Sequence, residues 1–232
     1  MHKFVFLLCL PTLLSAQLIQ PDSGKVWIGA WLDTADSKPG AKDGDRPLLF
    51  NQRFKSSASF FQYAQPIPIK SYPFPDEQIK DTGTDAAVFL SVLPDNGLEA
   101  ISDSSIAALA AQMKRLTVDE KRRVILRFGG EMNGPWAMWG RQPTLFRETW
   151  IKVYGAVKAA APAVNFVWSP SSGNGYPYGP EKMPRRGTPD FTLLDTNSDG
   201  EIDEKDDPYS PFYPGDAYVD WVGMSLSFLP SL

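Results

Sequence analysis

The stretch RVILRFGGEMNGPWAMWG, residues 123–140, decides the fold expected of this chain. It begins with an apolar, β-branched run at Val124, passes two glycines, and reaches a carboxylate at Glu131 before two tryptophans. Near-continuous apolar runs are typical of parallel strands that are buried on both faces. The stretch therefore predicts a buried strand over residues 124–128 that ends at a charged loop.

Five further apolar runs of the same kind are spread along the chain. They are residues 25–32, 57–69, 85–94, 164–170 and 218–228. Two longer segments, residues 102–116 and 144–162, space their apolar residues along one helical face. Ser102, Asp103 and Ser104 are candidate N-caps of the first of these helices.

The alternation of strands and helices favours an α/β fold. No GxGxxG motif follows any of the runs, so a (β/α)₈ barrel of the TIM type is expected rather than a dinucleotide-binding fold. The run at 57–69 is expected to change from helix to strand. About six strands are predicted where a closed barrel has eight, so the barrel is expected to be incomplete after the sixth strand.

The N-terminal segment MHKFVFLLCLPTLLSA, residues 1–16, has the pattern of an export signal. A short basic start precedes an apolar stretch that is too short to span a bilayer, and small residues mark a cleavage site after Ala16. The alternative is a buried N-terminal helix. The sequence thus predicts a secreted, extracellular protein with no membrane span, whose mature part, residues 17–232, forms one barrel domain.

The composition excludes several kinds of chemistry. His2 is the only histidine and Cys9 the only cysteine, and both lie in the predicted signal. A mature chain without them has no disulfide, no zinc site of the usual kind, no thiol nucleophile and no Ser-His-Asp triad. The net charge of −4, without a basic patch, does not favour nucleic-acid binding. No motif indicates a protein partner.

Glu131 follows a strand, at the end where parallel barrels carry their catalytic groups. Gly129 and Gly130 permit a tight turn and leave room for a ligand. Trp136 and Trp139 follow in the same loop, and flat apolar rings suit the C–H face of a sugar. A glutamate desolvated among aromatic rings is suited to general acid catalysis at neutral pH.

A structural alternative is that Glu131 pairs with Arg127 or Arg141 while both tryptophans belong to the core. Trp31, at the end of the first strand, is a candidate for a sugar subsite or for the core. Asn133 is a candidate for a hydrogen bond to a sugar hydroxyl or for capping the next turn.

The stretch RFGGEMNGPWAMWG, residues 127–140, resembles the fourth-strand motif of glycoside hydrolase family 26, the β-mannanase-like (β/α)₈ enzymes. GAW at 29–31, FVWSP at 166–170 and YPGDAYVDWVGMSL at 213–226 also resemble blocks of that family, in the same order. The resemblance implies a retaining glycosidase that acts on a polysaccharide such as β-mannan or mixed-linkage β-glucan, with Glu131 as general acid/base. The substrate-binding residues predicted for it are Trp31, Asn133, Trp136 and Trp139.

The chain departs from the family pattern at functional positions. Gly130 stands where a histidine usually precedes the acid/base glutamate, and Ser227 stands about where a tyrosine is expected. The resemblance places the nucleophile at the end of a seventh strand, beyond Leu232, so no nucleophile is assigned. The alternative to an enzyme is a truncated form that binds glycan without hydrolysing it, or that has no function.

The acidic stretch DTNSDGEIDEKD, residues 195–206, has the spacing of a calcium-binding loop. Oxygen ligands at alternating positions can surround one hard cation, and Gly200 permits the sharp turn between them. The predicted ligands of a structural Ca²⁺ are Asp195, Asn197, Asp199, Glu201, Asp203 and Asp206. The alternative is a solvated acidic turn without a metal.

Overall fold

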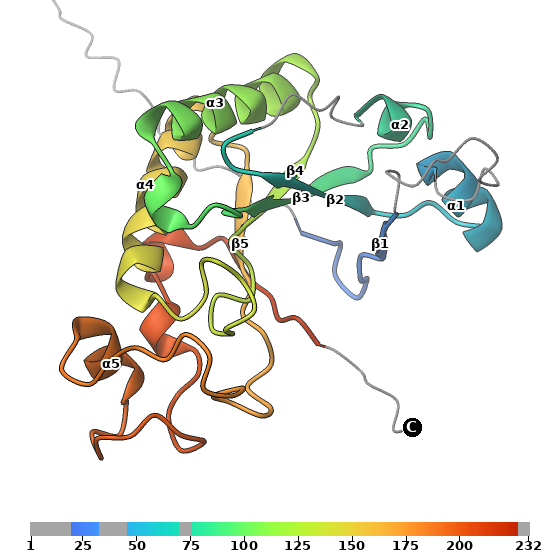
Figure 1. Cartoon of the computed structure of the whole chain (residues 1–232). Helices are drawn as coiled ribbons and strands as arrows, with labels where there is room; N and C mark the ends of the chain where they lie inside the picture. Colours follow the sequence, from blue (N-terminus) through green and yellow to red (C-terminus); the bar gives the residue numbers. More distant parts are fainter. Residues whose placement is uncertain (1–19, 33–45, 70–75, 227–232) are drawn as a thin grey trace, which may run out of the picture.

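Six parallel strands follow one another in sequence order across one curled sheet in the computed structural model, which describes residues 20–32, 46–69 and 76–226 (Figure 1). The strands are β1 (Gly29–Trp31), β2 (Phe60–Pro66), β3 (Ala87–Leu93), β4 (Val124–Phe128), β5 (Asn165–Trp168) and β6 (Trp221–Val222). Each connection between neighbouring strands carries helical segments, as parallel pairing requires. The predicted TIM-barrel type, with six of its eight strands, is confirmed.

Helices join the strands and cover the outer side of the sheet on the α3–α4 flank (Figure 1). The α-helices are α1 (Pro47–Phe54), α2 (Asp76–Lys80), α3 (Asp103–Lys114), α4 (Pro143–Ala160) and α5 (Pro189–Leu194). Short helical turns are η1 (Leu98–Ala100), the π-helical η2 (Arg115–Asp119), η3 (Ser210–Phe212) and η4 (Asp216–Tyr218). Ser102 caps α3, since its side chain accepts a hydrogen bond from the Ser105 N–H at 3.2 Å.

An aromatic cluster fixes the position of β4 against α4 and β5. The Phe128 ring at the end of β4 stacks on Phe146 of α4 at 6.3 Å, and Trp150 of α4 meets Phe166 of β5 edge-on at 5.8 Å. All four side chains are fully buried. Rings of this size contribute a large part of the apolar area buried in a core, so the end of β4 is held rigidly.

The outermost strands are shorter than predicted. β1 covers three residues of the run 25–32, and β6 covers two residues of the run 218–228. Each pairs with one neighbour among the described residues, so fewer ladder hydrogen bonds fix its ends.

The run at 57–69 contains only a strand; the helix expected at its start, α1, lies before the run and ends at Phe54. The predicted signal at 1–16 lies outside the described residues.

Candidate active site

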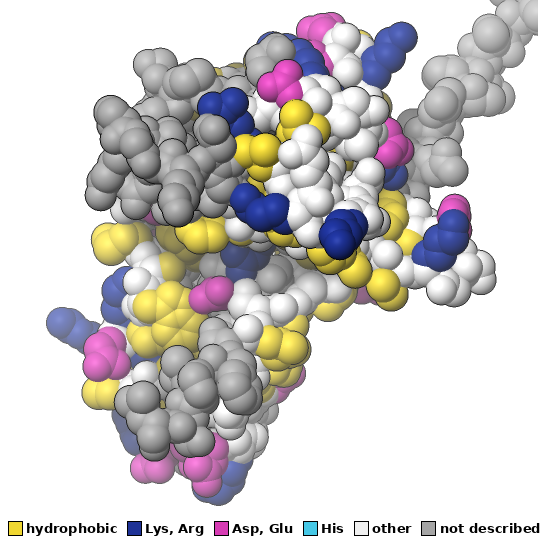
Figure 2. Space-filling view, turned by 90° about the vertical axis from the view of Figure 1, so that its right-hand side faces the viewer, with side chains coloured by type: hydrophobic (Ala, Val, Ile, Leu, Met, Phe, Trp, Pro, Cys, Tyr) yellow, Lys and Arg dark blue, Asp and Glu magenta, His cyan; other side chains and the backbone are white. Residues whose placement is uncertain are grey.

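A hollow of ≈ 380 Å³ opens at the C-terminal ends of β3 and β4. It is lined by Leu93, Asp95, Arg127, Gly130, Glu131, Trp136, Ala137, Met138 and Trp139. On the face shown in Figure 2, hydrophobic side chains lie next to acidic and basic ones around the middle of the molecule. The hollow thus combines one glutamate, one aspartate and one arginine with aromatic walls, at the end of the sheet where barrel enzymes place their chemistry.

The backbone at Glu131 turns sharply at the end of β4. Gly129 has φ 50° and Glu131 has φ 61°, so both residues lie in the left-handed region, which is uncommon for a residue with a side chain. The Glu131 N–H donates to the Ser169 carbonyl at 2.8 Å, which fixes the turn against the end of β5. Unfavourable backbone conformations of this kind cluster at functional sites. The turn directs the Glu131 side chain into the hollow.

Both carboxylate oxygens of Glu131 have a partner. The Trp136 indole Nε1–H donates to Oε2 at 2.8 Å, and the Arg127 Nη2 lies 3.5 Å from Oε1. The Glu131 side chain is 34% exposed, so it is accessible from the hollow. Glu131 therefore has a fixed orientation and an open approach, as a group that exchanges protons with a ligand requires.

Of the two arginines considered as ion-pair partners, Arg127 pairs with Glu131 and Arg141 does not. Arg141 is buried and donates to the carbonyls of Gly179 at 2.8 Å and of Glu181. Desolvation by burial lowers the pKa of Arg141 from its usual value. Arg141 thus holds the loop after β5 to the loop after β4.

The two tryptophans differ in exposure although they stand three residues apart. Trp136 is 52% exposed and meets the Tyr178 ring edge-on at 5.1 Å. Trp139 is 8% exposed, and its indole N–H donates to the Gly130 carbonyl at 2.9 Å. Trp136 is therefore available for stacking on a ligand, whereas Trp139 mainly supports the floor beneath Glu131.

Asn133 lies in the interior instead of facing a ligand. Its side chain is fully buried, and Nδ2 donates to the Ser171 carbonyl at 2.9 Å and to the Tyr178 hydroxyl at 3.0 Å. Its Oδ1 accepts from the Ser171 N–H at 2.8 Å. The amide therefore joins the β4 and β5 loops, and its contact with a sugar hydroxyl stays a prediction.

Trp31 is exposed, but it does not line this hollow. Its side chain is 62% exposed at the end of β1, three strands away from β4. The structure therefore places Trp31 on the surface and brings it neither into the core nor next to Glu131.

Asp95 is a carboxylate of the hollow that the sequence did not single out. It lies two residues beyond the end of β3, next to Pro94, and it is exposed. The available signal was its position just after a buried apolar run, the same position that made Glu131 a candidate. Two carboxylates near β6 do not line the hollow: Asp216 accepts a hydrogen bond from the Tyr213 hydroxyl, and Asp220 precedes β6 at the opposite end of the sheet.

The sequence profile of glycosyl hydrolase family 26 matches residues 80–229, a segment that starts at the last residue of α2, includes β3 to β6 and contains the whole hollow. The chain belongs to glycosyl hydrolase family 26. No curated protein sequence matches this family 26 chain. The match confirms the resemblance on which Glu131 was selected, and the role of Glu131 itself stays a prediction.

Solved structures have the same fold as this family 26 chain. The YdhT protein from Bacillus subtilis aligns at 15% identity and TM-score 0.51, over 85% of this chain and 62% of its own. The catalytic domain of a family 26 endo-β-1,4-mannanase from Bacillus sp. JAMB-750 aligns at 16% identity and TM-score 0.54, over 87% and 57%. An endo-β-mannanase/endo-β-glucanase from Prevotella bryantii aligns at 12% identity and TM-score 0.53, over 86% and 33%. This chain therefore spans less than two thirds of the length of each of these structures.

The acidic loop of this family 26 chain is held by its own hydrogen bonds. Asp206 is 4% exposed; its Oδ1 accepts from the Thr196 N–H at 2.7 Å, and its Oδ2 accepts from the Asp203 N–H at 2.8 Å. Asp195 Oδ2 accepts from the Gly200 N–H at 2.9 Å. The other predicted ligands, Asn197, Asp199 and Glu201, lie on the exposed part of the loop. Within the ranges that the structure describes, no three His, Cys, Asp or Glu side chains are grouped as a metal site would require.

One buried side-chain oxygen of the acidic loop has no hydrogen-bond partner. Asp195 Oδ1 is buried, and no hydrogen bond to it is present in the structure. A buried carboxylate oxygen without a donor is costly unless a cation or a water lies against it. This oxygen is the observation that fits a bound cation, because Asp195 occupies the first ligand position of the calcium spacing.

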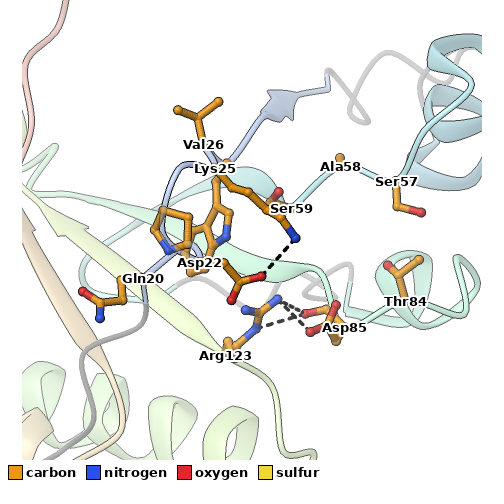
Figure 3. A pocket seen from close by; sticks show the side chains of 12 residues that line it. Gln20, Asp22, Lys25, Val26, Ser57, Ala58, Ser59, Thr84, Asp85 and Arg123 are labelled. Atoms are coloured by element: carbon orange, nitrogen blue, oxygen red, sulfur yellow. Dashed lines mark hydrogen bonds and ion pairs between the residues drawn. The ribbon is translucent and has the colours of Figure 1, made fainter.

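A second hollow, of ≈ 370 Å³, lies at the opposite end of the sheet, before β2, β3 and β4 (Figure 3). Its charged residues pair with one another: Arg123 bonds Asp85 at 3.0 Å, and Lys25 bonds Asp22 at 3.1 Å. Arg123 also lies over the Trp27 ring at 5.1 Å. This end of a barrel serves stability, and its internal pairing is consistent with that role.

Among the residues that the structure describes, no helix combines the length and the apolar character that crossing a lipid bilayer requires.

Proposed function

We propose that this protein is a secreted, retaining glycoside hydrolase that acts on β-mannan or β-glucan, with Glu131 as its general acid/base. One observation carries the proposal: the Glu131 carboxylate is held between Trp136 and Arg127 at the end of β4, in a hollow with an exposed aromatic wall. Family 26 membership supports the reaction class. Two of the similar structures are an endo-β-1,4-mannanase and an endo-β-mannanase/endo-β-glucanase, which supports the substrate class.

The chemistry assigned to Glu131 has two steps. In the first, its proton passes to the glycosidic oxygen as the bond to the anomeric carbon breaks and a nucleophile bonds that carbon. In the second, its carboxylate takes a proton from a water as that water bonds the anomeric carbon and the bond to the nucleophile breaks. The Trp136 ring next to the carboxylate offers a flat apolar surface to the sugar, and Tyr178 supports that ring from the side. A stacked sugar would present its glycosidic oxygen to Glu131.

A retaining reaction needs a second carboxylate as nucleophile, about 5–5.5 Å from the first. Among the described residues, Asp95 is the other carboxylate that lines the hollow, and it is exposed and on a loop. This observation favours a second candidate function, in which the chain binds glycan at Trp136 without cleaving it. We assign no nucleophile.

One experiment separates the two functions. The purified chain is incubated with a panel of mannans and β-glucans, and both reducing-end release and glycan binding are measured. Glu131→Gln should abolish release while binding is retained, because the substitution preserves shape and removes the proton. Trp136→Ala should weaken binding about tenfold, the equivalent of roughly 1.4 kcal/mol lost from aromatic contact. Glu99→Gln, a matched change at an exposed glutamate of η1, should alter neither.

Equal release by the wild-type chain and Glu131→Gln would exclude the acid/base assignment. Binding that depends on Trp136, without release by the wild-type chain, would establish the glycan-binding function instead. Binding that Trp136→Ala leaves unchanged would place the glycan outside this hollow.

We also propose that residues 195–206 bind one structural Ca²⁺, with Asp195 as a ligand through its unpartnered Oδ1. The cation would hold the loop between α5 and η3 and would take no part in bond cleavage. A chelator should then lower the melting temperature of the wild-type chain and leave that of Asp195→Ala unchanged. Glu204→Ala, a change at an acidic position between the predicted ligands, should keep the response to chelator. A wild-type melting temperature that does not respond to chelator or to added Ca²⁺ would rule out the site.

A further inference from the structure

We propose that Arg127 is the positioning residue of Glu131, and that Gly130 is a glycine in order to make room for the Arg127 guanidinium. The functional part of this inference rests on the proposed acid/base role of Glu131. Three features carry it: the space at Gly130, the double anchoring of the guanidinium, and the fixed geometry of the carboxylate.

The backbone conformation of Gly130 does not require a glycine. Its neighbour Gly129 has a positive φ, whereas the φ of Gly130 lies outside the left-handed region, so an L-residue is conformationally allowed there. A Cβ placed on Gly130 would overlap the Cζ, Nε and Nη2 of Arg127, closer than any non-bonded contact allows. The absent side chain is therefore the space that the guanidinium fills, next to the residue that carries the carboxylate.

The guanidinium has two partners, one in the segment after β6 and one in the loop after β4. Arg127 lies on β4, and its Nη2 donates to the Ser225 hydroxyl beyond β6 at 2.8 Å, while the same nitrogen lies 3.5 Å from Glu131 Oε1. Its side chain is 14% exposed. Burial lowers the pKa of Arg127 from its usual value, and the charge of Glu131 opposes that effect; the side chain stays a cation at neutral pH. The charge is thus enclosed with Glu131 as its carboxylate partner.

The carboxylate of Glu131 is consequently held at both ends. Arg127 fixes Oε1 from the strand side, and the Trp136 indole fixes Oε2 from the loop side. Loss of one anchor lets the carboxylate rotate about its side-chain bonds. A misplacement of about 1 Å at a reacting group costs on the order of 10²-fold in rate, while contacts to the sugar ring stay in place. Arg127 should therefore affect kcat and leave KM nearly unchanged.

The first readout is spectroscopic and requires no activity. In ¹⁵N–¹H spectra of the full chain, the Trp136 indole N–H signal, assigned by Trp136→Phe, reports its hydrogen bond to Glu131. The signal should move in Arg127→Gln and in Gly130→Ala toward its position in Glu131→Gln. Arg127→Lys should retain part of the wild-type position, because a cation is kept. Arg123→Gln, the same change at the other end of β4, should not move it.

Gly130→Ala provides a second test of the positioning role if Arg127→Gln fails to fold. It keeps the arginine, and the atoms that it displaces are the far end of a flexible side chain, so the chain should fold normally. The second readout is kinetic: kcat on β-mannan should fall about 10–100-fold in both variants, with KM within about twofold. Arg127→Lys should recover part of the loss.

The outcomes separate this inference from the proposed function. An unchanged Trp136 indole signal in folded Arg127→Gln and Gly130→Ala would overturn the positioning role, even if Glu131→Gln abolished hydrolysis. A rise in KM with constant kcat in those variants would also overturn it. Shifted signals together with full activity of Glu131→Gln would leave the positioning geometry standing and remove the acid/base role.

Discussion

Asn133→Ala should destabilise the protein strongly, because Asn133 joins two loops from inside the core. The amide makes three hydrogen bonds of 2.8–3.0 Å, two of them to the backbone of Ser171 and one to the Tyr178 hydroxyl, and its side chain is fully buried. If Asn133 were a sugar ligand, its removal would weaken glycan binding and have little effect on folding.

The magnitude follows from the number of bonds and from burial. Each hydrogen bond contributes about 0.5–1.5 kcal/mol net, and a buried partner left unpaired costs about 1–3 kcal/mol. The Ser171 N–H loses its acceptor, whereas Tyr178 keeps its bond to the Ser172 carbonyl at 2.6 Å. The free energy of unfolding should therefore fall by about 3–5 kcal/mol for Asn133→Ala, a large part of the ~5–15 kcal/mol typical of a domain.

The assay is urea unfolding followed by tryptophan fluorescence, with the m-value checked so that only stability is compared. Asn174→Ala serves as the matched control, because Asn174 lies exposed in the loop after β5 and should change stability by less than about 0.5 kcal/mol. A loss below about 1 kcal/mol for Asn133→Ala, accompanied by weaker glycan binding, would refute the structural role and support the sugar contact.

Two further changes test the surroundings of the hollow. Trp139→Ala should lower the free energy of unfolding by about 3–5 kcal/mol, because it empties a buried site and breaks the bond to the Gly130 carbonyl; a loss as small as that of the exposed Trp136→Ala would be incompatible with the floor position. Burial raises the pKa of Tyr178 from 10.0 to about 12, so its contribution to stability is fully present below pH 10 and is lost as the pH rises to about 12. Unfolding measured between pH 9 and 12 should show a smaller decline for Tyr178→Phe than for the wild-type chain; identical profiles would contradict this linkage.

The elements nearest the site could be predicted from local pattern alone. The run at 124–128 is a strand, and Ser102 caps the helix that precedes it, because apolar spacing and capping act over a few residues. The position of Glu131 at the end of β4 follows from the same run. The position where β4 ends could therefore be predicted without knowing which distant residues contact it.

The distribution of roles within the loop could not be predicted from the sequence, because it depends on distant partners. Asn133 is occupied by Ser171 and Tyr178, which stand 38 and 45 residues away in the sequence. Trp136 and Trp139 occur in the same short stretch, yet only the tertiary turn decides that one is exposed and the other buried. The need for a glycine at position 130 could not be predicted either, because it depends on the Arg127 guanidinium that occupies the space of a Cβ there.

The most direct test of acid catalysis by Glu131 compares two leaving groups on one sugar. The values of kcat/KM for the wild-type chain and Glu131→Gln are measured on a β-mannan oligosaccharide and on the matching 2,4-dinitrophenyl glycoside, whose leaving group departs without a proton. Glu131→Gln should lose about 10²–10⁴-fold on the oligosaccharide and only a small factor on the aryl glycoside. An equal loss on both substrates would contradict proton donation by Glu131.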